Sequence, residues 1–227
     1  MKHIKRLAAP KSWAIARKDE VYLAAPLPGK HTVQRGMAAA VVLKELIPLA
    51  KTTGEVRKML RAKDVLVDGK KIKEYKHSIG LMDVVSIPEI KEHFRILLDS
   101  HGRLFAHKIT DKESSIKPLK IVGKRADSKS KFQITLSDGR NLLVNDNSYK
   151  VGDTLVLEVP SQKILEHVPL AKGVQVYLMG GKHVAQKGSV EHVEGADVTY
   201  KSNKGESTTT LKVYCLGLGK SAVITLP

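Results

Sequence analysis

The stretch Thr52–Ile72, TTGEVRKMLRAKDVLVDGKKI, predicts a helix followed by a β-hairpin. Thr52 and Glu55 have the spacing of a capping box, in which the two residues satisfy the first free amides of a helix. Three apolar residues then fall on one face of that helix: Val56, Met59 and Leu60. Further on, a β-branched run ends in Asp68-Gly69, the kind of residue pair that a tight hairpin turn prefers.

The same stretch places its positive charges away from the apolar face. The cations of the helix, the turn and the following strand are Arg57, Lys58, Arg61, Lys63, Lys70, Lys71 and Lys73. From Lys51 to Lys76 there are nine Lys and Arg residues against four Asp and Glu residues. A solvated helix usually mixes charges of both signs. A basic helix face beside a basic turn therefore predicts a negatively charged partner.

The whole chain points to the same kind of partner. It has 227 residues and a net charge of +16, from 39 basic and 23 acidic residues, which favours a phosphate-rich polymer or an anionic membrane. We expect no membrane contact, because the longest apolar run, Met37–Leu43, is far shorter than the ~20 residues of a spanning helix. No apolar stretch follows the basic start of the chain, so we expect no signal peptide. Only 4% of the residues are aromatic, which favours recognition of backbone and shape over base stacking.

The sequence offers no pattern typical of an enzyme, a metal site or a cofactor site. Cys215 is the single cysteine, and we expect a buried strand thiol in a reducing cytoplasm. The Gly-Lys-Ser at 219–221 lacks the first glycine of a phosphate-binding loop, because Tyr214 stands in its place. Asp83 is the most tempting carboxylate, but it is more typical of a residue that caps a tight turn.

Residues 1–36 are predicted to form a basic arm. Six cations precede the first acidic residue: Lys2, Lys5, Arg6, Lys11, Arg17 and Lys18. One interpretation is a disordered tail. The other is an arm in which Trp13, the single tryptophan, contacts the body or packs on a nucleotide. We favour the arm, because a tail needs no tryptophan. We expect Met1–Lys18 to be mobile until the phosphates of a partner neutralise its charge.

The remaining chain reads as one α+β module followed by two β regions. A helical pattern over 38–47 precedes the opening stretch, and a strand over 84–87 follows it. Beyond Lys91, turn signals such as Asp138-Gly139 separate short strands, as in a small barrel or sandwich. Between the first two hairpins we expect the cation-rich segment Lys112–Lys131 to be a loop on the binding side. A second β unit with a five-strand pattern begins near Leu170.

Several blocks of the chain, in order, resemble a known family. They are KHIKRLAAPKSW, PLPGKHTVQRG, EVRKMLRAKDVLVDGKKI, GLMDVVSIPE, LSDGRN, YKVGDT and GKSAVITLP. Together they are similar to the small-subunit ribosomal protein family called S-four-e, found in archaea and eukaryotes. The short length and plain C-terminus are more similar to the archaeal members.

The resemblance implies a multidomain α+β protein. It implies a basic arm and linker over 1–41, an S-four-type RNA-binding module over 42–90 and a central β domain over 91–171. A KOW domain, which is a small SH3-like barrel, is implied over 172–215, with a tail over 216–227. Gly188 stands at the signature glycine of the KOW motif, where we expect a positive φ or a close backbone approach. Ala185-Gln186 stands where relatives often have another glycine.

The resemblance also implies a function in the cytoplasm, as a structural constituent of the small ribosomal subunit that supports assembly and translation. Its expected partners are small-subunit ribosomal RNA and neighbouring ribosomal proteins, without an obligate homo-oligomer, a cofactor or an enzymatic activity. The expected RNA-binding residues are Lys2, Lys5, Arg6, Lys11, Trp13, Arg35, Arg57, Lys58, Arg61, Lys63, Lys70, Lys71, Lys73, Lys182, Lys187 and Gly188. The alternatives are a KOW-type transcription elongation factor and the accessory domain of an RNA-modifying enzyme.

Overall fold

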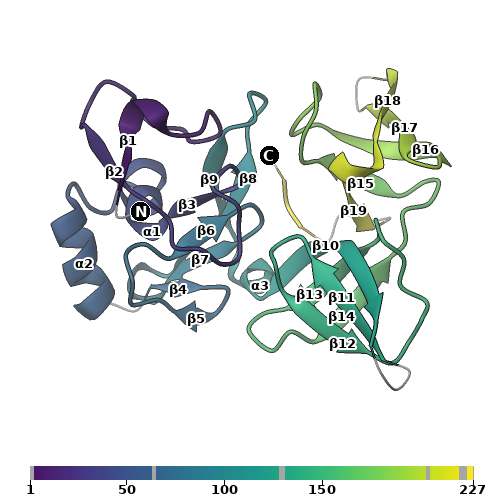
Figure 1. The fold of residues 1–227 in the computed structure, drawn as a ribbon, viewed down its shortest axis with the longest axis horizontal. Coiled ribbons are helices and arrows are strands. Elements are labelled where there is room, and N and C mark those ends of the chain that lie inside the picture. Colours follow the sequence, from purple (N-terminus) through teal and green to yellow (C-terminus); the bar gives the residue numbers. More distant parts are fainter. Residues whose placement is uncertain (1–2, 63–64, 128–130, 203–204, 220–223, 227) are drawn as a thin grey trace. The chain divides into compact units, whose positions relative to one another are not determined.

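The computed structural model describes residues 3–62, 65–127, 131–202, 205–219 and 224–226 (Figure 1). The chain divides into two compact units, Met1–Ser115 and Ile116–Pro227. Within the described residues, no helix is both long and apolar enough to cross a membrane.

Unit 1 combines three antiparallel sheets with short helices. The two-stranded sheets pair β1 (His3–Lys5) with β2 (Tyr22–Ala24) and β3 (Gly36–Ala38) with β6 (Ser78–Gly80). The five-stranded sheet has the order β5-β4-β7-β8-β9. Its strands are β4 (Leu66–Val67), β5 (Lys70–Lys71), β7 (Val84–Ile87), β8 (Glu92–Leu98) and β9 (Leu104–Ile109). The α-helices are α1 (Ala39–Val41), which continues as a π-helix over Val42–Leu46, then α2 (Thr53–Ala62) and α3 (Asp111–Ser114). Two 3₁₀ helices are Arg6–Ala8 and Pro88–Ile90.

The predicted capping box forms at the start of α2. The Glu55 amide donates to Thr52 Oγ1 at 3.2 Å, and the Thr52 amide donates to Glu55 Oε2 at 3.3 Å. A further bond from the Lys51 amide helps to lower the pKa of the Glu55 carboxyl, because backbone donors stabilise its charged form. Val56 and Leu60 are buried beneath the helix, as their spacing predicted.

The predicted hairpin forms as well. Asp68 and Gly69 both have positive φ, at 51° and 71°, as a two-residue turn between antiparallel strands requires. Val67 then pairs with Lys70, and Leu66 pairs with Lys71.

The hairpin that follows Lys91 extends the five-stranded sheet of unit 1. Residues 92–95 of β8 pair with β7, and β9 pairs with β8, on the C-terminal side of position 91, where we expect the central β domain to begin. Both strands therefore extend the sheet of unit 1. Ile96, Leu97 and Leu104 are almost fully buried there, so the hairpin contributes core residues to the first unit.

The N-terminal segment is packed against unit 1 rather than extended as a free arm. Trp13 is 2% exposed, and its Nε1 donates to the carbonyl of Val33 at 3.0 Å. The Leu104 amide donates to the Ser12 carbonyl at 2.7 Å, which attaches the segment to the edge of β9. Of the two roles considered for Trp13, contact with the body is the one observed.

Unit 2 contains two five-stranded antiparallel sheets. The first has the order β12-β11-β10-β13-β14 and the second β18-β17-β16-β15-β19. Strands of the first sheet are β10 (Ile116–Ala126), β11 (Phe132–Leu136), β12 (Asn141–Val144), β13 (Thr154–Glu158) and β14 (Ile164–Val168). Those of the second are β15 (Gln175–Leu178), β16 (Lys187–Glu194), β17 (Asp197–Ser202), β18 (Ser207–Leu211) and β19 (Cys215–Gly219). A 3₁₀ helix, Lys212–Tyr214, precedes β19.

The expected loop between Lys112 and Lys131 is wrong, because most of this segment forms strand β10. The segment is rich in lysine, but two of these lysines are buried and paired. Lys117 Nζ lies 3.3 Å from Asp138 Oδ2. Lys120 Nζ donates to the carbonyls of Lys212 and Cys215 and so links the two sheets of unit 2. Sequence reasoning counted these cations as solvent-facing and therefore missed a long strand.

Cys215, on the edge strand β19, and Gly188, on the inner strand β16, are both buried residues of the second sheet. Cys215 is a free, buried thiol whose pKa is raised by burial, as expected for a structural cysteine. Gly188 does not have the positive φ that we considered. The close approach is confirmed, but the neighbour is β17: a Cβ on Gly188 would lie closer than 3.0 Å to the Lys201 carbonyl oxygen and the Tyr200 ring.

Gly188→Ala should therefore destabilise unit 2, by about 1–3 kcal/mol, the usual cost of overpacking. Gly123→Ala is a matched control in the same unit, because its added Cβ would meet only an ordinary contact, at 3.8 Å from Thr135 Cβ. Urea unfolding and amide exchange of β15–β19 provide the measurement. Equal stability of the two variants would mean that β17 moves away from position 188 without cost.

Candidate nucleic-acid interface

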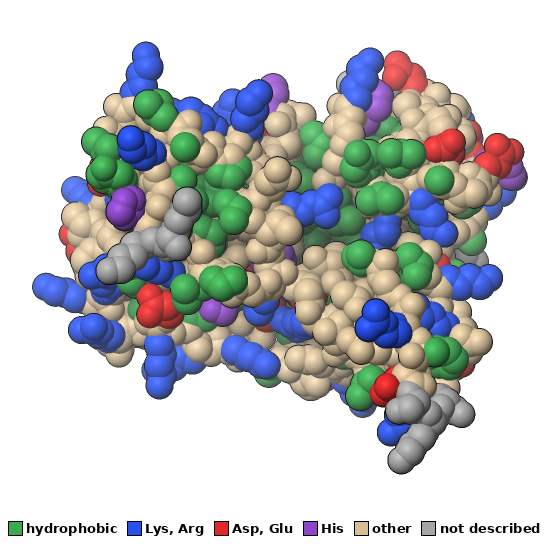
Figure 2. Space-filling view, viewed as in Figure 1, with side chains coloured by type: hydrophobic (Ala, Val, Ile, Leu, Met, Phe, Trp, Pro, Cys, Tyr) green, Lys and Arg blue, Asp and Glu red, His purple; other side chains and the backbone are tan. Residues whose placement is uncertain are grey.

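The outer face of α2 carries an uninterrupted group of cations. Arg57, Lys58 and Arg61 are all exposed, while Val56 and Leu60 on the opposite face are buried. Figure 2 shows Lys and Arg side chains along the part of unit 1 that contains α2 and the β4–β5 hairpin. The amphipathic helix thus divides its surface as predicted, with charge outward and core residues inward.

Arg57 is held in place by an aromatic ring. Its Cζ lies 4.1 Å from the centroid of the Tyr75 ring, a cation–π distance. The Tyr75 carbonyl accepts a hydrogen bond from the Ala40 amide at 2.8 Å, which attaches the backbone of Tyr75 to α1. A planar guanidinium stacked in this way keeps its N–H donors in a fixed plane. Sequence reasoning missed this pair, because Tyr75 lies beyond the hairpin and shares no spacing with α2.

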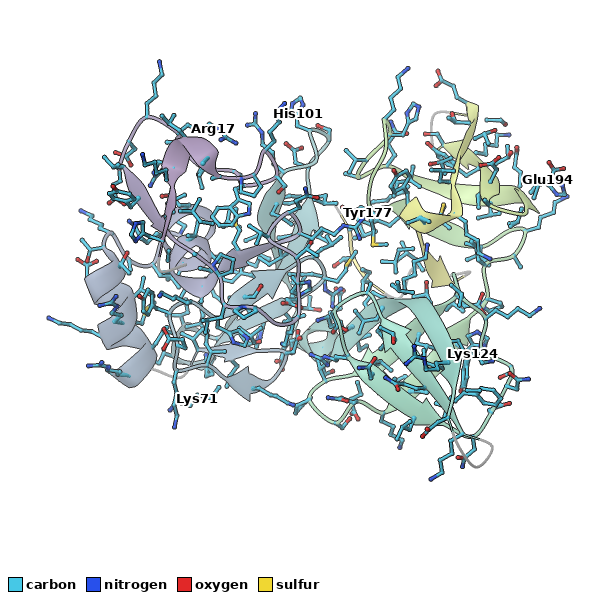
Figure 3. The ribbon with its side chains drawn as sticks, viewed as in Figure 1. Arg17, Lys71, His101, Lys124, Tyr177 and Glu194 are labelled. Carbon is cyan, nitrogen blue, oxygen red and sulfur yellow. The ribbon has the colours of Figure 1, made fainter. Side chains whose placement is uncertain are left out.

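The hairpin adds a second group of cations to unit 1. Lys70, Lys71 and Lys73 are exposed, and Lys71 projects away from the ribbon in Figure 3. The turn beneath them is fixed by Asp68, whose carboxylate is fully buried. Asp68 Oδ1 accepts the Val84 amide at 3.1 Å, and Oδ2 lies 3.3 Å from Lys30 Nζ.

The loop over 26–35 carries Lys30 and the exposed Arg35, and a histidine anchors it. His31 Nε2 lies 2.9 Å from Asp83 Oδ2, and both side chains are buried, at 4% and 0% exposure. The ring sits against two glycines: a Cβ on Gly36 or on Gly80 would lie closer than 3.0 Å to His31 atoms. Asp83 also accepts the Gly80 amide at 3.0 Å, so its predicted role as a turn cap is confirmed, and its bond to His31 is an addition.

Several predicted contact residues lie on the surface. Lys5, Lys11, Arg35 and Lys182 are exposed, like the cations of α2 and the hairpin. Lys187 is partly buried, with its Nζ donating to the Leu226 carbonyl at 2.8 Å and its pKa lowered by burial. Lys2 and Lys63 lie outside the described residues.

Three predicted contact residues are inside the protein, and their assignment is corrected. Arg6 is 1% exposed, and its Nη2 lies 2.8 Å from Glu45 Oε1, so its charge is matched within unit 1. Trp13 is buried as described above, which leaves no ring face for a nucleotide. Gly188 is buried between β15 and β17, where its missing Cβ serves strand packing.

The exposed cations of unit 1 are suited to electrostatic binding of phosphates. Lys and Arg side chains neutralise phosphates and release the counterions bound to them. No group of three or more His, Cys, Asp or Glu side chains suited to hold a metal occurs among the described residues.

Comparisons with known proteins place the chain in a family. The model of the ribosomal family S4e matches residues 90–164, and the model of the RS4NT domain matches residues 1–34. The small ribosomal subunit protein eS4 of Methanococcus vannielii is 35% identical, covering 96% of this chain and 94% of its own length. The chain belongs to the ribosomal family S4e. The predicted resemblance is thereby confirmed.

Other members of the S4e family match over most of their length. The small ribosomal subunit protein eS4 of Nanoarchaeum equitans is 42% identical, over 88% of this chain and 85% of its own. The crystal structure of the 30S ribosomal protein S4e from Thermoplasma acidophilum aligns with a TM-score of 0.72 and 29% identity, covering 82% of this chain and 96% of that one. The S4e match includes β8 and β9 of unit 1, and the RS4NT match covers the packed N-terminal segment.

The buried pair of His31 and Asp83 should be strongly coupled. His31→Ala should cost about 1–3 kcal/mol of stability, because it leaves a buried carboxylate with one donor fewer. A double-mutant cycle with Asp83→Asn should give a coupling free energy of at least ~0.5 kcal/mol by urea unfolding.

His192 and Glu194 provide the matched control for that cycle. Their charged atoms also lie 2.9 Å apart, but the side chains are 66% and 77% exposed, so His192→Ala with Glu194→Gln should show little coupling. Additive effects at His31 and Asp83 would contradict the role of this pair in anchoring the 26–35 loop.

Proposed function

We propose that this chain is a structural constituent of the cytoplasmic small ribosomal subunit that binds ribosomal RNA through the basic surface of unit 1. The observation that carries the proposal is the exposed face of Arg57, Lys58 and Arg61 on α2, supported by a buried apolar face and a stacked tyrosine. The curated relatives are named small ribosomal subunit proteins, which is consistent with this role.

The proposed interface consists of the exposed cations of unit 1. They are Lys5, Lys11, Arg35, Arg57, Lys58, Arg61, Lys70, Lys71 and Lys73. Arg6 and Trp13 are left out, because both are buried with protein partners. Helices α1 and α2 together with the β4–β5 hairpin form the part of unit 1 that we assign to an S-four-type RNA-binding module.

The second sheet of unit 2 is proposed to be a KOW domain. Its strand order, β18-β17-β16-β15-β19, has the first strand in the sequence between the second and the last, as in an SH3-like barrel. The 3₁₀ helix Lys212–Tyr214 joins the last two strands. In this proposal Lys182, in the turn before β16, contacts RNA, while Gly188 supports the packing of β16 on β17. Neighbouring proteins of the subunit are further proposed partners, and no catalytic role is proposed.

The α2 face can be tested by charge removal in the full chain. Replacing Arg57, Lys58 and Arg61 together by alanine should leave folding intact, because all three side chains are exposed. Affinity for a transcript of small-subunit ribosomal RNA should fall. The slope of log affinity against log salt should become shallower by about 2–3, since each lost phosphate contact removes roughly 0.7–0.9. Circular dichroism and urea unfolding verify the fold.

A second triple variant controls for the general loss of charge. Lys150, Lys163 and Lys172 are also exposed, but they lie in unit 2 outside the proposed interface. Their replacement by alanine should change the slope much less. A slope that is unchanged in the folded α2 variant, or reduced equally in both variants, would rule out a specific role for α2.

Tyr75 should contribute to RNA affinity by orienting Arg57. Tyr75→Leu keeps apolar bulk but removes the ring, and the loss of a surface cation–π pair of ~0.5–1 kcal/mol predicts about a two- to fivefold weaker affinity. Tyr75→Phe keeps the ring and should bind nearly as well as the unmodified chain. The binding assay with the same transcript distinguishes the two. If Tyr75→Leu binds as tightly as Tyr75→Phe, the stack does not prepare Arg57 for RNA.

A further inference from the structure

Strand β18 forms an edge of the second sheet in unit 2. It pairs with β17 on one side and, among the described residues, has no strand on the other. Its sequence, Ser-Thr-Thr-Thr-Leu, has no charged residue and no proline, and its pairing with β17 has no bulge. Natural edge strands are usually protected by such features, because an open edge invites another strand to pair. Strand β5, which consists of Lys70 and Lys71, shows this protection in the same chain.

The register identifies which backbone groups of β18 face outward. The Ser202 amide donates to the Glu206 carbonyl, and the Lys212 amide donates to the Ala196 carbonyl, at opposite ends of the β17–β18 pair. Hydrogen-bonded and non-bonded pairs alternate along an antiparallel ladder. Both ends give the same assignment. The residues with N–H and C=O groups directed away from β17 are Ser207, Thr209 and Leu211.

Carboxylates outnumber exposed cations beside this edge, although the chain carries a net charge of +16, and the exposed cation among them is Lys201, opposite Ser207 on β17. Four carboxylates lie on β16, β17 and the turn before β18: Glu191, Glu194, Asp197 and Glu206. Glu191 accepts a bond from the Ser207 hydroxyl at 3.0 Å, so it lies directly beside the edge. Glu194 projects from the end of the β16–β17 hairpin in Figure 3, and Figure 2 shows acidic side chains at this end of unit 2.

We propose that β18 binds an extended, basic segment of another protein as an additional antiparallel or parallel strand. The outward N–H and C=O groups of Ser207 and Thr209 supply backbone hydrogen bonds, as in other cases of strand addition, while the Leu211 carbonyl accepts a bond from Cys215 Sγ at 3.7 Å. The neighbouring carboxylates select lysine or arginine side chains on the incoming strand and repel nucleic acid. A second copy of this chain fits less well, because pairing of two β18 edges would bring two sets of carboxylates together and they would repel each other. The proposal does not depend on the RNA interface of unit 1.

Strand β12 provides a second open edge with a different surrounding charge. Strand β12 also forms an edge and has no charged residue, and its Leu143 is 65% exposed. The β10–β12 region near it carries more cations than carboxylates: Lys124, Arg125, Lys131 and Arg140 against Asp127 and Asp138, of which Asp138 pairs with Arg140. A basic peptide should therefore distinguish the two edges by charge, which makes β12 an internal control.

The experiment uses the purified full chain, labelled with ¹⁵N, and a capped heptapeptide of alternating lysine and valine. Binding should shift and protect the amides of Ser207, Thr209 and Leu211, while those of Thr208 and Thr210, already bonded to β17, change little. Affinity should fall at least fivefold in high salt. A peptide with glutamate in place of lysine should not bind at β18, and the β12 amides should stay unprotected.

Variants at Thr209 separate the backbone from the side chain. Thr209→Pro removes one outward N–H and no backbone bond to β17, although it also removes the hydroxyl contact with Thr199 Oγ1, as Thr209→Val does. Thr209→Lys adds the charge that protects other edges. Both should weaken peptide binding at least fivefold, and Thr209→Lys keeps the test valid if the proline variant does not fold. Thr209→Val removes only the hydroxyl and should bind normally.

Three results would overturn the proposal. The first is equal binding of the glutamate peptide, or peptide binding without protection of the outward amides. The second is protection of these amides by a small-subunit RNA transcript, which would make the edge a nucleic-acid site. The third is a dimer of the full chain in sedimentation equilibrium that Thr209→Lys dissociates, which would make a second copy the partner.

Discussion

The buried carboxylate of Asp68 holds the basic hairpin of unit 1 in a fixed position. Its Oδ1 accepts the Val84 amide, its own amide donates to the Val84 carbonyl, and its Oδ2 lies beside Lys30. A buried carboxylate is stable only when such partners are present, so the turn, β7 and the 26–35 loop are held together. The cations above them therefore sit on an ordered frame, and less conformational entropy is lost when a polyanion binds.

Positive charge in this chain serves two purposes, and net charge alone does not separate them. Exposed cations such as Arg57 and Lys71 face solvent, while Arg6, Arg95 and Lys117 are almost fully buried beside carboxylates. Burial lowers the pKa of Arg95 to about 10, so this guanidinium remains charged at neutral pH.

Local features could be predicted from the sequence, and contacts between distant segments could not. The capping box of α2, the Asp68-Gly69 turn and the buried Cys215 each depend on neighbours a few residues away. The partners of Arg6 and of Lys120 are far along the chain, at Glu45 and Cys215, and no periodic pattern in the sequence predicts these contacts. For the same reason the sequence does not show which strands share a sheet across Lys91, since only the register of β7 with β8 shows that the hairpin beyond Lys91 extends the sheet of unit 1.

The fit of His31 against Gly36 and Gly80 has a consequence for divergence among relatives and for engineering. A β-carbon at either glycine would collide with the imidazole, and a smaller residue at 31 would leave both glycines beside an empty space. The same close packing therefore constrains the residues at positions 31, 36 and 80. During evolution a larger or smaller residue at one of these positions requires compensating changes at the others. The loop that carries Lys30 and Arg35 cannot be grafted onto another scaffold alone. The graft must also include the two glycines against which the ring of His31 packs.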